Sequence, residues 1–145
     1  MGAKAVSIIA TIALIASAAA LLIRRGVLAS GPVSASLQIA GLLLVLWARL
    51  TFGLRSFHCA ANPTRGALIT SGPYRYVRNP IYAAVWLMAW VGVAMHWSLI
   101  NAALALVIAA TLVIKIACEE KLLRAAYPEY DDYAKRTARL IPFVI

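Results

Sequence analysis

Acidic residues are scarce in this 145-residue chain, and they are confined to its C-terminal part. They are Glu119, Glu120, Glu129, Asp131 and Asp132. With 14 lysines and arginines, the formal net charge is +9. A nucleic-acid-binding protein would need these basic residues on a water-exposed face. Here they lie beside long apolar runs, which favours anionic lipid headgroups as partners and argues against nucleic acid.

Cysteine is also scarce. Cys59 and Cys118 are too few for a disulfide framework or a cysteine-based metal site, so we expect free thiols and no metal. His58 beside Cys59 has no further candidate ligand near it in the sequence. The chain also lacks internal repeats, and its length indicates one domain over residues 1–145. Its hydrophobic fraction of 63% exceeds the roughly 45–50% of soluble domains, which indicates an integral membrane protein.

Four apolar runs predict an all-α membrane protein. The first, 5–23, contains 19 residues without a charge, close to the roughly 20 that cross the hydrocarbon core as a helix. Its alanine-rich tail also resembles a signal-peptide cleavage site, but the apolar run continues to Ile23 and fills a full span. The other spans are expected at about 33–54, 80–95 and 99–114. A charged helical segment continues from the fourth, and Tyr127-Pro128 is expected to end or kink it.

The distribution of basic residues predicts the orientation. Four spans place both termini on one side of the membrane, together with the connector before residue 80. Of the 14 lysines and arginines, only Arg24 and Arg25 lie on the other side. Because cytoplasmic loops carry the excess of basic residues, we expect the termini and the C-terminal helical segment in the cytoplasm. Alanine and arginine richness hints at a bacterial source, and hence an inner membrane.

The stretch from Thr70 to Tyr82 is the polar, basic and aromatic segment between these runs. Gly72-Pro73 predicts a turn, because glycine tolerates positive φ and proline presets the next φ. Asn79-Pro80 predicts a helix start, with Asn79 at the cap and Pro80 at the first helical position. The arginines and tyrosines between these two marks suit an anionic or nucleoside-like ligand at the bilayer edge.

The third and fourth spans are joined by a short break, so they should form an antiparallel hairpin. The hairpin brings the start of the third span next to the end of the fourth. Lys115 and Glu119, four residues apart on one helical face, should then lie near Arg75 and Arg78. The residues alone leave Glu120 undecided between a functional role and a solvated helix face.

Two separated motifs carry a family resemblance. The string from Leu68 to Tyr82 resembles the signature of the isoprenylcysteine carboxyl methyltransferase family, which overlaps in pattern with membrane phospholipid N-methyltransferases. The C-terminal pattern is similar to the same family's second half. That pattern comprises Glu119-Glu120, Leu122-Leu123, Tyr130, Tyr133, Arg136 and Leu140-Ile141-Pro142. The resemblance covers about half of the chain.

The resemblance implies an enzyme that transfers a methyl group from S-adenosylmethionine to a lipophilic acceptor from the bilayer, with its site facing the cytoplasm. It implies a supporting part, 1–64, and a donor-binding and catalytic part, 65–145. Arg78, Lys115 and Glu119 are the expected catalytic residues, and Lys115 also binds the acceptor. The implied donor contacts are Gly66, Ala67, Leu68, Ile69, Tyr74, Arg78, Asn79, Pro80, Ile81 and Glu119.

Two residues depart from the family pattern. Histidine usually stands where this chain has Asn79, and arginine where it has Lys115. Asparagine cannot hold a charge or shuttle a proton at neutral pH. Lysine keeps the positive charge but lacks the bidentate fork that suits a carboxylate. Carboxyl O-methylation of the isoprenylcysteine type is the expected reaction, and N-methylation of a phospholipid amine is the alternative.

Two non-enzymatic classes compete with this interpretation. A small multidrug-type transporter needs an acidic residue inside the bilayer, but the first three expected spans contain none. A membrane assembly subunit would not need the arginine and tyrosine pattern of the 70–82 stretch. Neither class should bind S-adenosylmethionine. We also expect Lys135, Arg136 and Arg139 to contact lipid headgroups.

Overall fold

A computed structural model describes residues 3–28, 30–53 and 68–141, and its described part is built from helices. The elements are α1 (Ala3–Ile23), α2 (Pro32–Phe52), the 3₁₀ turn η2 (Gly72–Arg75), α3 (Pro80–Met95), α4 (Leu99–Ala126) and α5 (Tyr130–Arg136). Within the described ranges, the β pairing is one isolated bridge between Val77 and Ala138. The predicted free thiol at Cys118 is confirmed, while Cys59 and His58 lie outside the described residues.

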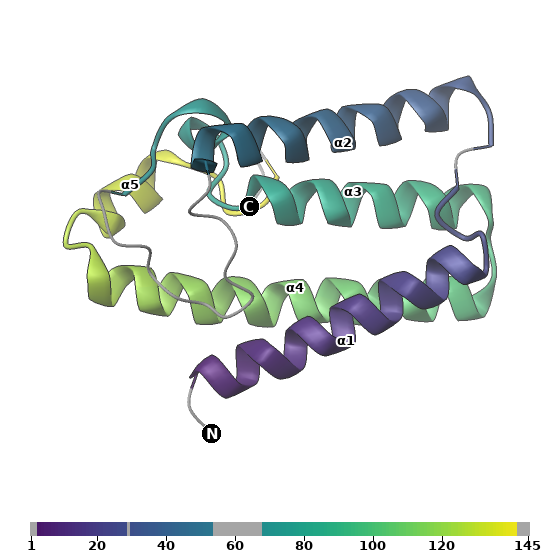
Figure 1. The fold of residues 1–145 in the computed structure, drawn as a ribbon, viewed down its shortest axis with the longest axis horizontal. Helices are drawn as coiled ribbons and strands as arrows, with labels where there is room; N and C mark the ends of the chain where they lie inside the picture. Colours follow the sequence, from purple (N-terminus) through teal and green to yellow (C-terminus); the bar gives the residue numbers. More distant parts are fainter. Residues whose placement is uncertain (1–2, 29, 54–67, 142–145) are drawn as a thin grey trace.

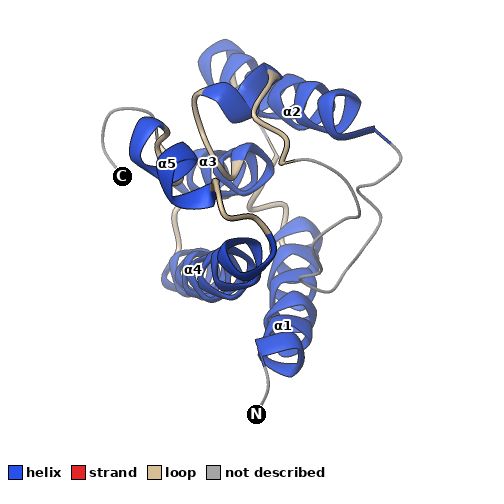
Figure 2. Ribbon diagram, turned by 90° about the vertical axis from the view of Figure 1, so that its left-hand side faces the viewer, coloured by secondary structure: helices blue, strands red, loops and turns tan. Residues whose placement is uncertain are grey.

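The helices α1 to α4 run alternately in opposite directions along the long axis of the molecule (Figure 1). α1 packs against α4, α2 packs against α3, and α3 and α4 form the expected hairpin (Figure 2). The start of α1, the start of α3 and the end of α4 therefore lie at one end of the molecule, together with η2 and α5. This is the end at which the sequence places its candidate site.

Local chemistry explains the helix boundaries. Pro32 and Pro80 occupy first-turn positions, where a missing N–H leaves no intrahelical bond unmade. Ser98 caps α4 by accepting a hydrogen bond from the Asn101 N–H at 3.1 Å. α4 ends at Ala126, immediately before Tyr127-Pro128 as predicted. The expected fourth span and the charged segment after it form one continuous helix of 28 residues.

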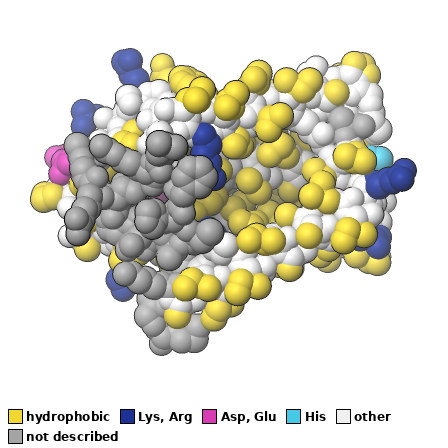
Figure 3. Space-filling model, in the orientation of Figure 1, with side chains coloured by type: hydrophobic (Ala, Val, Ile, Leu, Met, Phe, Trp, Pro, Cys, Tyr) yellow, Lys and Arg dark blue, Asp and Glu magenta, His cyan; other side chains and the backbone are white. Residues whose placement is uncertain are grey.

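Three helices of the described chain, α1, α2 and α4, are long and apolar enough to cross a membrane. α3 is also apolar but has only 16 residues. Many large hydrophobic side chains are exposed on the helix shafts, among them Ile12 on α1 and Leu42 on α2. Figure 3 shows hydrophobic side chains over much of one face, with basic side chains at its right-hand end and over its left-hand part. Such a surface suits a hydrocarbon surrounding.

The buried core lies where α1, α3 and α4 meet. It comprises Leu21, Ala89, Val93, Ala105, Ile108 and Leu112. Gly92 brings α3 very close to the turn that follows α1. A Cβ at this position would clash with the carbonyl oxygen of Gly26 and lie 2.5 Å from the Cα of Val27. This close approach fixes how α3 sits against the α1–α2 connection.

Replacing Gly92 by alanine should therefore destabilise the fold, because backbone atoms cannot move aside as a side chain can. We expect a loss of about 2–3 kcal/mol, measured by denaturant unfolding in detergent micelles. Gly41→Ala is the matched control, since its Cβ would meet the flexible side chain of Met88 at 2.9 Å. Equal losses in both variants would contradict the proposed backbone contact.

Candidate functional site

The turn between Gly72 and Arg75 forms as the sequence predicts. Gly72 has φ +58°, and a Cβ there would clash with Thr51 of α2, so a side chain is excluded on two grounds. The buried Tyr74 ring packs against Phe52 with centroids 5.7 Å apart. Burial raises the pKa of Tyr74 to about 12, so its hydroxyl stays protonated at physiological pH. The turn thus rests on the end of α2.

The C-terminal segment is tied to the residues between η2 and α3. The Arg78 N–H donates to the Ala138 carbonyl at 2.8 Å, and the Ala138 N–H donates to the Tyr76 carbonyl at 3.0 Å. Asn79 is the N-cap residue of α3, but its side chain makes no capping bond. Its Nδ2 instead donates to the Arg139 carbonyl at 2.9 Å. Asn79 therefore holds the C-terminal segment, a role that the sequence did not indicate.

A buried carboxylate gathers three arginines at this end. Glu120 is 3% exposed, and its oxygens lie 3.3 Å from Arg78 Nε, 3.1 Å from Arg139 Nη2 and 3.6 Å from Arg124 Nη2. Arg78 also donates through Nη1 to the carbonyls of Ala134, at 2.6 Å, and Thr137. Charge and hydrogen bonds together satisfy the buried group, as a buried ion requires. Glu120 joins the starts of α3 and of the C-terminal segment to α4.

Lys115 and Glu119 form a second polar cluster on α4, where Glu119 directly precedes Glu120 and Lys115 lies one helical turn before Glu119. Lys115 is 5% exposed, and its Nζ lies 3.6 Å from Glu119 Oε1. The Tyr82 hydroxyl of α3 donates a hydrogen bond to the same carboxylate oxygen. The Lys115 ammonium lies 5.8 Å from the centre of the Tyr82 ring, within cation–π range. The expectation that Lys115 and Glu119 share one face of the helix is confirmed, and the two side chains form an ion pair.

α1 also contacts this cluster. Lys115 Nζ donates to Thr11 Oγ1 at 2.9 Å and to Ser7 Oγ at 3.5 Å. Ser7 is fully buried. The Lys115 cluster, defined as Ser7, Thr11, Tyr82, Lys115 and Glu119, therefore draws on three helices. The sequence had placed α1 in the supporting part of the chain.

The remaining predicted residues occupy several places. Arg75 is exposed and lies over the ring of Tyr76, so among the described residues the contact found for it is not with the Lys115 cluster. The carboxylate that Arg78 contacts is Glu120, the neighbour of the expected Glu119. Leu68, Ile69 and Ile81 are partly buried, and Pro80 is buried. Gly66 and Ala67 lie outside the described residues.

Six residues of these clusters were missed or left undecided by the sequence: Ser7, Thr11, Tyr82, Glu120, Arg124 and Arg139. The sequence shows two adjacent glutamates among basic residues, but no local pattern shows which of the two is buried. Arg139 pairs with Glu120 while its side chain stays 49% exposed, and its expected contact with lipid headgroups stays a prediction. Among the described residues, no group of three or more His, Cys, Asp or Glu could hold a metal ion.

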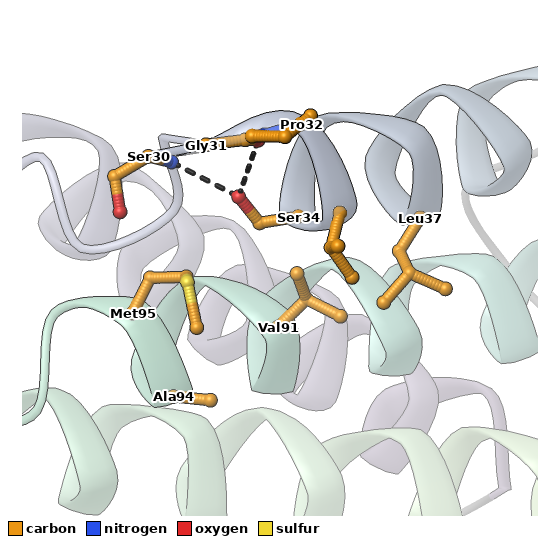
Figure 4. Close-up of a pocket in the computed structure, with 9 residues that line it drawn as sticks. Ser30, Gly31, Pro32, Ser34, Leu37, Val91, Ala94 and Met95 are labelled. Atoms are coloured by element: carbon orange, nitrogen blue, oxygen red, sulfur yellow. Dashed lines mark hydrogen bonds between the residues drawn. The ribbon is translucent and has the colours of Figure 1, made fainter.

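A separate cavity of about 310 Å³ lies at the opposite end of the helices (Figure 4). It opens between the start of α2 and the end of α3, and its walls include Leu37, Val91 and Met95. Ser34 lies at its rim, where its hydroxyl bonds to the backbone of Ser30 and Gly31. The walls carry no charged group, so this cavity offers less chemistry than the clusters at the other end.

Comparisons with known proteins point to one family. The sequence model of the phospholipid methyltransferase family matches residues 31–130. Cobalt-zinc-cadmium resistance protein CzcN of Cupriavidus metallidurans is 40% identical over 77 residues, which are 52% of this chain and 35% of that protein. Nickel-cobalt-cadmium resistance protein NccN of Alcaligenes xylosoxydans xylosoxydans is 36% identical over 76 residues, 52% of this chain and 36% of that protein. The chain thus matches about a third of the length of these relatives. No solved structure matches.

The Glu120 cluster gives a testable stability prediction. Glu120→Gln keeps the shape but leaves Arg78 and Arg139 without their counter-charge, so we expect a loss of about 3–5 kcal/mol in unfolding free energy. The control is Asp131→Asn, which breaks an exposed pair with Arg124 and should change stability little. Denaturant unfolding in detergent measures both. A Glu120→Gln protein as stable as the control would show that the buried pairs do not hold the C-terminal segment.

Proposed function

Because the chain belongs to the phospholipid methyltransferase family, we propose that it transfers a methyl group from S-adenosylmethionine to a lipophilic acceptor arriving from the bilayer. The Lys115 cluster is the observation that carries this proposal. It sets a buried cation and a partly exposed carboxylate side by side on a helix long enough to cross a membrane. Charged residues in such helices are rare and mark functional sites.

The two charges suit the two substrates. The Glu119 side chain is 27% exposed, so it is accessible to a cationic donor, and the Tyr82 hydroxyl fixes its orientation. Lys115 is available to an anionic acceptor group. S-Adenosylmethionine, when bound, supplies a methyl group whose bonding electron pair leaves with the sulfonium sulfur as the acceptor atom attacks. The protein's task is then chiefly to hold both substrates in line.

The segment from Arg78 to Ile81 lines the donor site in this proposal, together with Tyr74, Leu68 and Ile69; the expected donor contacts Gly66 and Ala67 lie outside the described residues. Arg78 uses its Nε and Nη1 groups on Glu120 and on the C-terminal segment. We therefore assign it the role of fixing this segment, so that backbone groups at the start of α3 are presented to the donor carboxylate. In this proposal, Arg78 acts on catalysis indirectly, by holding the start of α3 in the position that binds the donor.

Carboxyl O-methylation of the isoprenylcysteine type is the preferred reaction, because a buried ammonium favours an anionic acceptor. N-methylation of a phospholipid amine is the second candidate. The description of the matched family favours that candidate, whereas the chemistry of Lys115 favours the first. The two reactions give different products and are separable by experiment.

We further propose that α3 crosses the membrane together with α1, α2 and α4, although it has only 16 residues. The termini and the Lys115 cluster would face the cytoplasm of a bacterial inner membrane, as the concentration of basic residues at that end favours. The exposed hydrophobic shafts of α1 and α2 support the membrane location.

Donor binding tests the role of Glu119. Glu119→Gln removes the negative charge and should weaken S-adenosylmethionine binding about tenfold or more, as the loss of a charge-assisted contact predicts. Isothermal calorimetry in detergent measures the dissociation constant. Glu129→Gln is the control, since Glu129 is exposed and precedes α5. Unchanged donor affinity in Glu119→Gln would refute this role.

Product chemistry tests the acceptor. Purified protein is incubated with methyl-labelled donor and either a farnesylcysteine carboxylate or phosphatidylethanolamine. We expect label in a base-labile methyl ester of the carboxylate, and a strong decrease with Lys115→Met, which removes the ammonium but keeps an unbranched side chain. Base-stable label in the aminophospholipid would instead establish the second candidate.

A further inference from the structure

α1 lies outside residues 31–130, the part that matches the family, yet it supplies two hydroxyls to Lys115. We propose that Thr11 is a positioning residue for the acceptor: it holds the Lys115 ammonium in place to receive a membrane-borne carboxylate. This inference rests on the proposed function, and it assigns α1 a part in the site rather than in support alone.

The direction of the hydrogen bonds supports this role. Thr11 Oγ1 donates its single proton to the Ser7 carbonyl at 2.8 Å. Only lone pairs of this oxygen therefore remain for Lys115, which lies 2.9 Å away and must act as the donor. The backbone of α1 thus sets the polarity of the contact, and the hydroxyl is suited to a protonated ammonium.

The lengths of the contacts around Lys115 Nζ are unequal. The Thr11 contact is short, at 2.9 Å, whereas Ser7 Oγ lies at 3.5 Å and Glu119 Oε1 at 3.6 Å. Hydrogen bonds of an ammonium to oxygen are normally 2.7–2.9 Å long, so with respect to residues 3–28, 30–53 and 68–141 two of its three protons are weakly satisfied. An acceptor carboxylate gains most from these two protons while Thr11 retains the third.

Burial makes the positioning matter. Lys115 is 5% exposed, and a loosely held ammonium among apolar helices would turn toward Glu119 or toward the water-exposed end. Ser7 and Thr11 are one turn apart on a helix that is otherwise almost wholly apolar. The shared face directs both hydroxyls at α4, which α1 packs against (Figure 2).

Thr11→Val removes the hydroxyl and keeps the shape of the side chain. We expect the KM for the farnesylcysteine carboxylate to rise about tenfold, as the loss of a hydrogen bond to a charged group predicts, with kcat and donor affinity unchanged. Thr11→Ser should restore the wild-type KM. Thr111→Val is the matched control, because within the described part of the chain the Thr111 hydroxyl donates to the Ile108 carbonyl of its own helix.

Several outcomes would overturn the inference: an unchanged KM in Thr11→Val, an equal rise in Thr111→Val, or no rescue by serine. Loss of donor binding in Thr11→Val would reduce α1 to a structural role and overturn it as well. If the wild-type protein binds no S-adenosylmethionine, the proposed function fails. The inference is then decided by binding of the farnesylcysteine carboxylate, measured by tryptophan fluorescence. Binding to the wild type but not to Thr11→Val supports the inference, and any other result refutes it.

Discussion

The buried carboxylate of Glu120 is the constraint on which this end of the molecule depends. A charge almost removed from water must be neutralised and hydrogen-bonded, and three arginines from α3's approach, α4 and the C-terminal segment supply this. Arg78 extends the arrangement through its bonds to Ala134 and Thr137. The Glu120 side chain thereby fixes the segments that surround Glu119. Since the two glutamates are consecutive residues, the arginine cluster around Glu120 lies directly beside the candidate site.

The Lys115 cluster contains fewer ion pairs than the arginine cluster around Glu120. Glu120 is buried among three arginines at 3.1 to 3.6 Å, whereas Glu119 pairs with Lys115 at 3.6 Å and remains partly exposed. Fully paired ions stabilise and position, while weakly paired ions retain free energy of interaction for a ligand. In the proposed function, this difference gives two adjacent glutamates different roles: Glu120 holds the surrounding segments in place, and Glu119 contacts the donor.

The sequence predicted the features that depend on near neighbours. Gly72 marks a turn and Asn79-Pro80 a helix start through local backbone preferences, and Lys115 meets Glu119 because they are four apart on a helix. The expected hairpin also brought Arg78 near the end of α4, but the sequence did not show which distant side chains would meet. Arg78 meets Glu120 across 42 positions, and Lys115 meets Thr11 across 104. Which residues meet depends on how each helix is rotated about its axis, and packing of the whole bundle decides that rotation.

Because α4 is one continuous helix, the spacing between the two charged residues of the candidate site is fixed. Lys115 and Glu119 are carried by one unbroken helix, so their backbone positions are separated by about 6 Å along the axis, and no hinge can alter that spacing. An acceptor whose charge sits on the reacting atom and one whose charge lies two carbons away would offer that atom at different heights above Lys115. In the proposed function, the fixed spacing would favour those acceptors in which the distance between the charge and the reacting atom matches it.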